Sequence, residues 1–265
     1  MKRPCLLITG ATGRLGTALQ RRFAGSCDLR LVCLNPGNEP GVVTADLSRS
    51  DSRWTRHFEG VDAVLHCAGQ SSPSAAWVDV ERHNVDATLN VFEAAVQGGV
   101  RRVVFMSSNW TMAGYRFRPE RLTVDLPPRP TNPYGVSKAV CERIGRSFAA
   151  HRGLSIVCLR IGYCPGWAAG DPRLSKSLWA RQKWLSDRDF LQLVERSVHA
   201  KDVQFAIVNG VSNNAGMRWD LAMGRRLLDY EPVDGNVSAG RVAHLREFLA
   251  RFTIGSRRYQ EWAGS

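Results

Sequence analysis

The chain has 265 residues, of which 44% are hydrophobic and 23% charged, and its formal net charge is +12. Such a chain can bury a full core, and its composition is not that of a disordered segment. No stretch approaches the roughly 18 consecutive apolar residues that a membrane helix requires. The apolar run near the N-terminus spans only about four residues before glycines interrupt it, too short for a signal peptide. We therefore expect a soluble, cytoplasmic protein with no membrane partner.

The positive charge raises the question of a nucleic-acid partner. The arginines are spread along the whole sequence, without a helix-turn-helix signature, a zinc-finger spacing or a basic tail. We therefore expect no nucleic acid and interpret the charge as a solvated basic surface that also attracts small anions.

Cysteine and histidine spacings predict neither a disulfide framework nor a metal site. The seven cysteines are scattered, mostly lie in apolar runs and form no C-x-x-C pair. The six histidines form no H-E-x-x-H motif. We expect reduced thiols and no metal.

Short apolar runs alternate with helical patterns along the first part of the chain. The expected strands are residues 4–9, 29–34, 62–67, 101–107 and 154–161, and the expected helices are residues 14–25, 77–97 and 134–152. This alternation predicts an α/β fold, a Rossmann-type doubly wound parallel sheet. After residue 162 the alternation fades. We expect a dinucleotide-binding domain over residues 1–162 and a small substrate-binding lobe over 163–265, packed on the first domain and not independent.

The sequence TGATGRLG, residues 9–16, directly follows the first expected strand and opens the first expected helix. In this context Gly10, Gly13 and Gly16 allow a tight turn, close approach of the backbone to a pyrophosphate, and close packing of helix on strand. The motif therefore predicts a dinucleotide site.

Two further segments belong to this predicted site. Asp46 could accept a hydrogen bond from an adenine amino group, or it could simply cap a helix. The small-residue turn HCAG, residues 66–69, follows another strand at the edge of the sheet where ligands of open α/β folds bind.

The end of the second expected strand lacks the acidic residue that normally holds the adenosine ribose of NAD. Cys33 stands where that acid is expected, and Asn35 follows two residues later. Without the carboxylate a 2′-phosphate is not repelled, and Arg14 could reach one. The cofactor is therefore expected to be NAD or NADP.

Tyr134 and Lys138 are four residues apart in NPYGVSK, just after a proline that can open a helix. Both side chains would lie on one helical face. Tyrosine has a pKa of about 10, and a fixed neighbouring cation favours its phenolate form. The pair could serve as a base, or it could be an ordinary helix start.

With TGxxGxxG and YxxxK in one chain, the sequence resembles the extended short-chain dehydrogenase/reductase family, which includes the NAD-dependent epimerases and dehydratases. The resemblance implies that Tyr134 is the general acid/base, that Lys138 binds the nicotinamide ribose, and that Ser108 positions the reacting oxygen. Asn84 matches the family's helix asparagine near the active site. The remaining cofactor-binding positions that the resemblance implies are Thr12, Leu15, Leu47, Cys67, Ala68, Gly69 and Ile161.

Within this family the chain resembles the uronate dehydrogenases over nearly its whole length. The similar segments are SSNWTMAGY, NPYGVSK, LRIG, WLSDRDF and NGVSNNAGMRWD. The resemblance implies hydride transfer between a nicotinamide cofactor and an anomeric or secondary hydroxyl of a sugar-derived substrate. Ser71, Ser108 and Asn109 match substrate-binding residues of that group.

Three departures fall in the expected substrate pocket. Trp110 replaces a histidine, Tyr163 replaces a serine, and Trp179 stands where the group has the arginine that binds the uronate carboxylate. Arg173 or Arg181 could take over that role if the longer loop at residues 164–183 folds differently. The aromatic residues could instead stack on a sugar, or simply pack the core of the lobe.

Two other functions remain open at this stage. One is a nucleotide-sugar epimerase or dehydratase with retained cofactor, although such enzymes usually carry a larger substrate lobe. The other is a non-catalytic dinucleotide-binding sensor, although such proteins commonly lose the tyrosine or the lysine. Because family members often associate through the helix that carries the tyrosine, the resemblance also implies a homo-oligomer.

Overall fold

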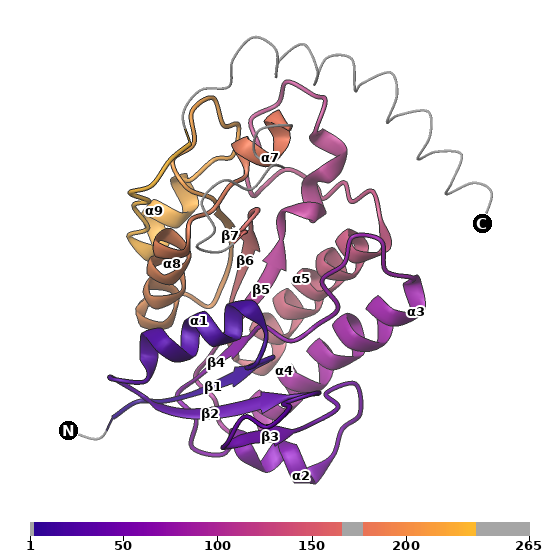
Figure 1. Cartoon of the computed structure of the whole chain (residues 1–265), viewed down its shortest axis with the longest axis vertical. Helices are drawn as coiled ribbons and strands as arrows, with labels where there is room; N and C mark the ends of the chain where they lie inside the picture. Colours follow the sequence, from indigo (N-terminus) through magenta and orange to yellow (C-terminus); the bar gives the residue numbers. More distant parts are fainter. Residues whose placement is uncertain (1–2, 166–176, 237–265) are drawn as a thin grey trace.

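A computed structural model describes residues 3–165 and 177–236 of the chain (Figure 1). Its centre is one seven-stranded sheet in the order β3-β2-β1-β4-β5-β6-β7, and every neighbouring pair is parallel. The strands are β1 (Cys5–Thr9), β2 (Asp28–Cys33), β3 (Val42–Thr44), β4 (Ala63–His66), β5 (Arg102–Ser108), β6 (Ser155–Ile161) and β7 (Phe205–Gly210). This topology confirms the predicted Rossmann-type fold.

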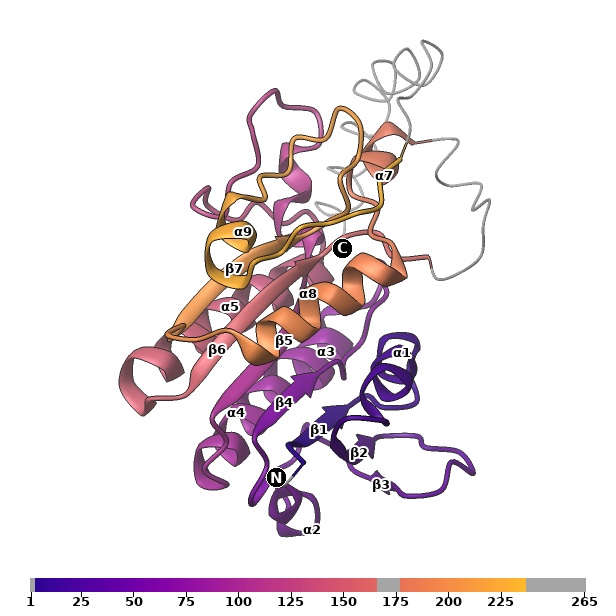
Figure 2. The same ribbon diagram turned by 90° about the vertical axis from the view of Figure 1, so that its left-hand side faces the viewer.

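Helices cover both faces of the sheet (Figures 1 and 2). One face carries α1 (Arg14–Phe23), α8 (Asp187–His199) and α9 (Ala222–Leu228). The other carries α3 (Trp77–Val80), the π-helical turn η2 (Glu81–Asp86), α4 (Ala87–Gln97) and α5 (Pro133–Arg152). The shorter elements are α2 (Ser52–Thr55), η1 (Arg56–Phe58), η3 (Asn109–Tyr115) and α7 (Leu178–Gln182).

Alternation along the strands builds a separate core on each face. In β1, Leu6 and Ile8 belong to the core under α1 and α8, whereas Leu7 belongs to the core under α4 and α5. All three residues are essentially inaccessible to solvent, because a parallel strand covered by helices on both sides is apolar throughout.

The sheet does not end where the sequence analysis placed the domain boundary. Residues after 162 contribute β7, which pairs with β6, and α8, which packs on the same face as α1. The amphipathic helix in DRDFLQLVERSVH and the strand FAIVNG therefore extend the dinucleotide-binding layer. The boundary at residue 162 reflects an apparent fading of the alternation, not an edge of the sheet.

Two loop regions meet beyond the carboxyl ends of β5, β6 and β7. Leu122, in the loop that follows η3, forms a bridge with Trp219. The Nδ2 group of Asn209 donates hydrogen bonds to the carbonyl oxygens of Leu122 and Asp220, at 2.8 and 3.0 Å. These contacts hold the two loops together over the end of the sheet where ligands of such folds bind.

No helix in the part of the chain that the structure describes is long and apolar enough to cross a bilayer. Residues 3–165 and 177–236 also contain no group of three or more side chains suited to hold a metal ion. All seven cysteines are free thiols.

Candidate active site

The glycine turn between β1 and α1 has the geometry that the motif predicts. Gly10 adopts a φ of +64°, and a Cβ atom there would lie 2.7 Å from the backbone nitrogen of Ala68. A Cβ on Gly16 would lie 2.3 Å from the Gly10 carbonyl oxygen, and Gly13 forms the N-cap of α1. A side chain at Gly10 or Gly16 would therefore push apart elements that must touch. The turn leaves the N-terminus of α1 facing the ligand edge of the sheet, which suits a pyrophosphate.

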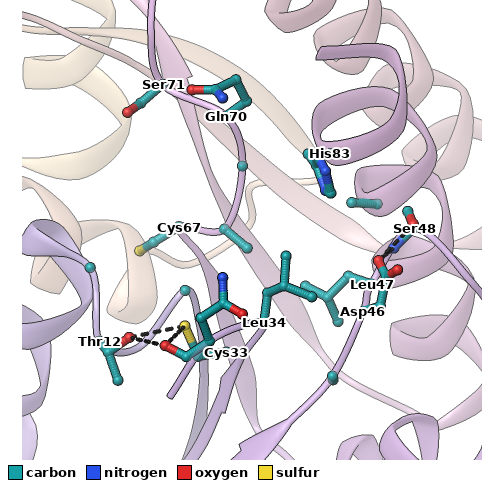
Figure 3. A pocket seen from close by; sticks show the side chains of 17 residues that line it. Thr12, Cys33, Leu34, Asp46, Leu47, Ser48, Cys67, Gln70, Ser71 and His83 are labelled. Atoms are coloured by element: carbon teal, nitrogen blue, oxygen red, sulfur yellow. Dashed lines mark hydrogen bonds between the residues drawn. The ribbon is translucent and has the colours of Figure 1, made fainter. Parts of the chain in front are cut away.

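Beside this turn lies a cavity of about 440 Å³, at the point where the strand order reverses between β1 and β4 (Figure 3). Most predicted cofactor positions line it, namely Gly10, Thr12, Gly13, Cys33, Asp46, Leu47, Cys67, Ala68 and Gly69. The predicted substrate residue Ser71 also lines it, at the end opposite Thr12 and Cys33. The sequence analysis did not assign the other lining residues to the cofactor site: Leu34, Asn35, Ala45, Ser48, Gln70, His83 and Ala87. The residues present fit a bound dinucleotide.

Cys33 occupies the end of β2, as the sequence predicts. Its Sγ atom lies 3.0 Å from the Thr12 hydroxyl and 3.9 Å from the Asn35 carbonyl oxygen. Burial alone would raise the pKa of the Cys33 thiol, but the hydrogen bonds of Thr12 and of the following backbone outweigh burial and lower that pKa. The ribose end of the cavity thus has a small polarisable group in place of a carboxylate.

Asp46 is held by its own neighbours. Its carboxylate accepts hydrogen bonds from the Ser48 hydroxyl at 2.6 Å and from the Arg82 guanidinium at 2.7 Å. The Ser48 hydrogen bond, followed by the contacts from Arg82, lowers the pKa of Asp46 to about 2. The carboxylate therefore stays ionised and lines the cavity as a fixed acceptor.

Six predicted cofactor positions do not line this cavity: Arg14, Leu15, Gly16, Asn84, Lys138 and Ile161. Arg14 turns toward Cys164, whose Sγ lies 3.4 Å from Nη1, and toward the Asp187 carboxylate at 4.0 Å. Its guanidinium is therefore engaged near α8. Leu15 packs against the core under α1 and α8, and Ile161 is buried at the end of β6.

Tyr134 and Lys138 lie on one face of α5, as their spacing predicts. Asn132 caps the helix by accepting a hydrogen bond from the Gly135 N–H at 2.7 Å, with Pro133 in the first turn. The Lys138 ammonium lies 5.9 Å from the centre of the Tyr134 ring and donates to the Met106 carbonyl oxygen at 3.0 Å. Among the described residues none forms a hydrogen bond with the Tyr134 hydroxyl, so it can meet a substrate.

Ser108 ends β5 and begins η3 next to this helix. Its hydroxyl oxygen accepts a hydrogen bond from the Trp110 N–H at 3.2 Å, which fixes the turn. A Cβ on Gly135 would lie 2.6 Å from the Trp110 carbonyl oxygen, so only glycine lets α5 approach η3 this closely. The first turn of α5 is therefore packed directly against the turn that carries Ser108.

Asn84 connects the cavity to the first turn of α5. Its Nδ2 group donates to the Gln70 carbonyl oxygen at 3.1 Å and to the Ser137 hydroxyl at 2.9 Å. The Ser137 hydroxyl in turn donates to the Tyr134 carbonyl oxygen at 2.8 Å. Asn84 sits in the π-helical turn η2, and π-turns occur frequently at functional sites. Asn84 thus links the cavity-lining residue Gln70 to the turn of α5 that carries Tyr134.

The aromatic substitutions lie together beyond β5 and β6. Trp179 is buried in the core cluster, with its ring 5.5 Å from the Trp219 ring. Tyr163 pairs with Trp184 in a short parallel bridge that continues β6. Trp110 and Arg181 are both partly exposed. Arg173 lies outside the described residues.

Sequence reasoning missed Lys183, which is 7% exposed and lies among these residues. Its ammonium is 4.9 Å from the centre of the Trp110 ring and 5.9 Å from that of Trp179. It also donates to Asn109 Oδ1 at 3.4 Å. The available signal was a lysine between the two tryptophans of LWARQKWL, a segment in which only arginine had been considered as a carboxylate ligand.

Several known proteins are similar to this chain over most of its length. NAD-dependent glucose-6-phosphate dehydrogenase of Haloferax volcanii is 34% identical over 87% of this chain and 94% of its own length. Uronate dehydrogenase of Pseudomonas putida is 35% identical over 81% of this chain and 79% of its own length. The crystal structure of uronate dehydrogenase from Agrobacterium tumefaciens superposes with a TM-score of 0.78 at 30% identity, covering 97% of this chain and 90% of that one.

The family assignment rests on a match over most of the chain. The sequence pattern of the NAD-dependent epimerase/dehydratase family matches residues 6–181, which contain the glycine turn, Ser108, Tyr134 and Lys138. Together with the relatives described above, this match shows that the chain belongs to the NAD-dependent epimerase/dehydratase family.

Proposed function

We propose that the protein oxidises the anomeric hydroxyl of a sugar with NAD, using Tyr134 as the base. The observation that carries the proposal is the packing of Tyr134, Lys138 and Ser108 at the carboxyl ends of the strands, next to a cavity that fits a dinucleotide. A sensor would need only the cavity. A buried lysine beside a tyrosine with an unoccupied hydroxyl supports chemistry.

The relatives support the same reaction class. Those that cover most of the chain are an NAD-dependent glucose-6-phosphate dehydrogenase, a uronate dehydrogenase and an L-arabinose 1-dehydrogenase that uses NAD(P)+. The chain is accordingly an enzyme of the oxidoreductase type, and its cofactor is NAD. The reaction that these relatives suggest for this chain is the oxidation of a sugar at its anomeric carbon.

In the proposed reaction, NAD held in the cavity beside the glycine turn would supply the acceptor for the hydride of the anomeric carbon. The Ser108 hydroxyl orients the sugar hydroxyl, and the Tyr134 phenolate takes its proton. The ammonium of Lys138 stabilises the negative charge on Tyr134, and its bond to the Met106 carbonyl keeps it in place. The carbon–hydrogen and oxygen–hydrogen bonds break as the carbonyl forms, so a cyclic sugar yields a lactone.

An epimerase is the second candidate, because it would use the same three residues. The UDP-glucose 4-epimerase of Streptomyces lividans is 35% identical, but over only 57% of this chain and 49% of its own length. The chain therefore matches about half of that epimerase. The whole-length similarity to dehydrogenases favours net oxidation with NADH release.

The test is NADH formation with purified protein, NAD and a panel of glucuronate, galacturonate, glucose 6-phosphate, L-arabinose and UDP-glucose. We expect one of the free sugars to be consumed, the amount of NADH formed to be proportional to it, and a lactone to be the product. Isomerisation of UDP-glucose without net NADH would establish the epimerase instead. No turnover with any panel member, despite tight NAD binding, would favour a sensor.

Three further expectations remain part of this proposal. We propose that copies of the chain associate through α5, that the protein is cytoplasmic, and that residues 163–265 supply the small substrate-binding lobe. Light scattering of the purified protein tests the first. Arg143 is an exposed residue of α5. The charge reversal Arg143→Glu should therefore lower the measured mass of the assembly if α5 is the interface.

A further inference from the structure

Backbone contacts place Lys183 at the end of β6. The N–H of Tyr163 donates to the Lys183 carbonyl oxygen at 2.6 Å, and the N–H of Leu185 donates to the Tyr163 carbonyl oxygen at 2.8 Å. A Cβ on Gly162 would lie 2.1 Å from the Lys183 carbonyl oxygen, so glycine is required for this approach. Because β6 pairs with β5, Lys183 is brought beside the residues that end β5.

The Lys183 ammonium has neighbours but no counter-ion in residues 3–165 and 177–236. The rings of Trp110 and Trp179 and the carbonyl group of Asn109 are its recorded partners. No described carboxylate lies within ion-pair distance of its nitrogen. Arg116 adds a like charge nearby. A buried ammonium without a counter-ion is costly, because the aromatic faces and one amide do not replace its hydration.

Asn109 contributes a second donor in need of an acceptor. Its side chain is 2% exposed, and its Nδ2 group has no hydrogen-bond partner among the described residues. Its Oδ1 atom already accepts from Lys183. The ammonium and the amide N–H₂ therefore form a pair of buried donors at one point, and a negatively charged oxygen would satisfy both.

The position of this pair relates it to the reacting end of the site. Asn109 directly follows Ser108 at the start of η3, so the pair of donors lies next to the residue expected to position the reacting oxygen. Burial lowers the pKa of Lys183 to about 7. The same low-dielectric surroundings would strengthen the attraction between the protonated Lys183 ammonium and an anion.

We infer that Lys183, together with the amide of Asn109, binds a carboxylate or phosphate group of the sugar substrate and thereby selects anionic sugars. The inference rests on the proposed function, because it assigns the charged end of the substrate whose hydroxyl meets Ser108 and Tyr134. It also identifies a cation that can serve where Trp179 replaces the arginine of the uronate dehydrogenases.

The test compares wild type with Lys183→Met, Lys183→Arg and the exposed-lysine control Lys201→Met. Equilibrium binding of glucuronate, glucose 6-phosphate and glucose is measured by calorimetry with NADH present, and KM and kcat are measured with NAD. Lys183→Met should weaken the binding of the preferred anionic sugar by roughly tenfold to a hundredfold and should leave the affinity for glucose within about twofold of wild type. Lys183→Arg should keep most of the preference, and Lys201→Met should match wild type.

The ligand that responds identifies the group bound: glucuronate indicates a carboxylate and glucose 6-phosphate indicates a phosphate. Equal weakening of charged and neutral sugars would overturn the inference, since it would indicate a structural role. A wild type that does not prefer either anionic sugar over glucose would overturn it as well. Lys183-dependent anion binding without NAD reduction would remove the proposed function and keep the anion site. Turnover of sugars that Lys183→Met does not affect would keep the proposed function and remove the anion site.

Discussion

Glu142 and Arg160 form a buried ion pair, with Oε2 and Nη2 2.9 Å apart and both side chains at most 2% exposed. The Glu142 carboxylate also accepts a hydrogen bond from the Ser107 hydroxyl at 2.6 Å. Glu142 lies one helical turn after Lys138 on α5, while Ser107 and Arg160 belong to β5 and β6. The pair therefore fastens the helix that carries Tyr134 and Lys138 to the strands beneath it.

Removing one partner of this pair should destabilise the fold strongly. Glu142→Gln leaves the Arg160 charge buried without compensation, which should lower the free energy of unfolding by about 3–5 kcal/mol. Glu93→Gln, which breaks the exposed Glu93–Arg152 pair, is the matched control and should cost less than about 1 kcal/mol. Urea unfolding measures both. Equal effects of the two substitutions would show that the buried pair has no special role.

Substitution of Gly10 should damage the nucleotide site specifically. Gly10→Ala and Gly37→Ala both place a side chain at a φ near +60°, at a cost of about 1 kcal/mol. Only at Gly10 would the new Cβ meet neighbouring backbone, whereas Gly37 has open space around it. We expect Gly10→Ala to lose NAD binding and Gly37→Ala to retain it, as measured by calorimetry. Similar NAD affinities for the two variants would contradict the role assigned to this turn.

Cys33→Asp should sharpen the preference for NAD over NADP. A carboxylate at the end of β2 can hydrogen-bond to the ribose hydroxyls and repels a 2′-phosphate. We expect NADP affinity to fall at least about tenfold, with NAD affinity unchanged or higher. Cys33→Ser is the neutral control, which keeps a small polar group. Unchanged NADP affinity in Cys33→Asp would show that the adenosine ribose does not lie beside Cys33.

The stability of the protein without substrate should depend on pH through Lys183. Burial, aided by the like charge of Arg116, lowers the pKa of Lys183 from 10.5 to about 7. Between these values the unfolded chain holds the proton and the folded chain does not, so Lys183 costs stability below pH 7 and the cost shrinks as pH rises toward 10.5. Arg218, which lies over the Trp179 ring, adds to the positive surroundings.

Lys183→Met removes this cost. The variant should exceed wild type in free energy of unfolding at pH 6, and the difference should shrink by at most about 1.4 kcal/mol per pH unit above pH 7. Chemical unfolding of both proteins at pH 6, 7, 8 and 9 measures the trend. A difference that grows with pH, or a variant less stable than wild type at pH 6, would contradict the assigned burial.

The sequence predicted those parts of the fold and site that local pattern determines. The five expected strands and three expected helices are present, because apolar runs and helical periodicity are properties of short segments. The glycine turn and the Tyr134–Lys138 face were predictable for the same reason, since each lies within one continuous motif. The π-helical turn at Asn84 was read as ordinary helix, because its register change leaves no mark in the apolar pattern.

What the sequence could not predict depends on segments that meet only in three dimensions. The sequence suggests that Arg14 could reach a 2′-phosphate, but it carries no sign of the contacts that Arg14 makes with Cys164 and Asp187 beside α8. Lys183 was missed because its significance comes from Asn109 and Trp110, more than seventy residues earlier in the chain. Long-range convergence of this kind carries no local signal.

The most direct test of the central claim compares the initial rate of NADH formation by wild type, Tyr134→Phe and Tyr115→Phe with the preferred sugar. Tyr115 is the control because its hydroxyl already donates a hydrogen bond to the Pro127 carbonyl oxygen. The account predicts that Tyr134→Phe loses at least about a hundredfold in kcat while NAD binding is unchanged, and that Tyr115→Phe stays close to wild type. If Tyr134→Phe retains most of its kcat, Tyr134 is not the base and the proposed mechanism is wrong.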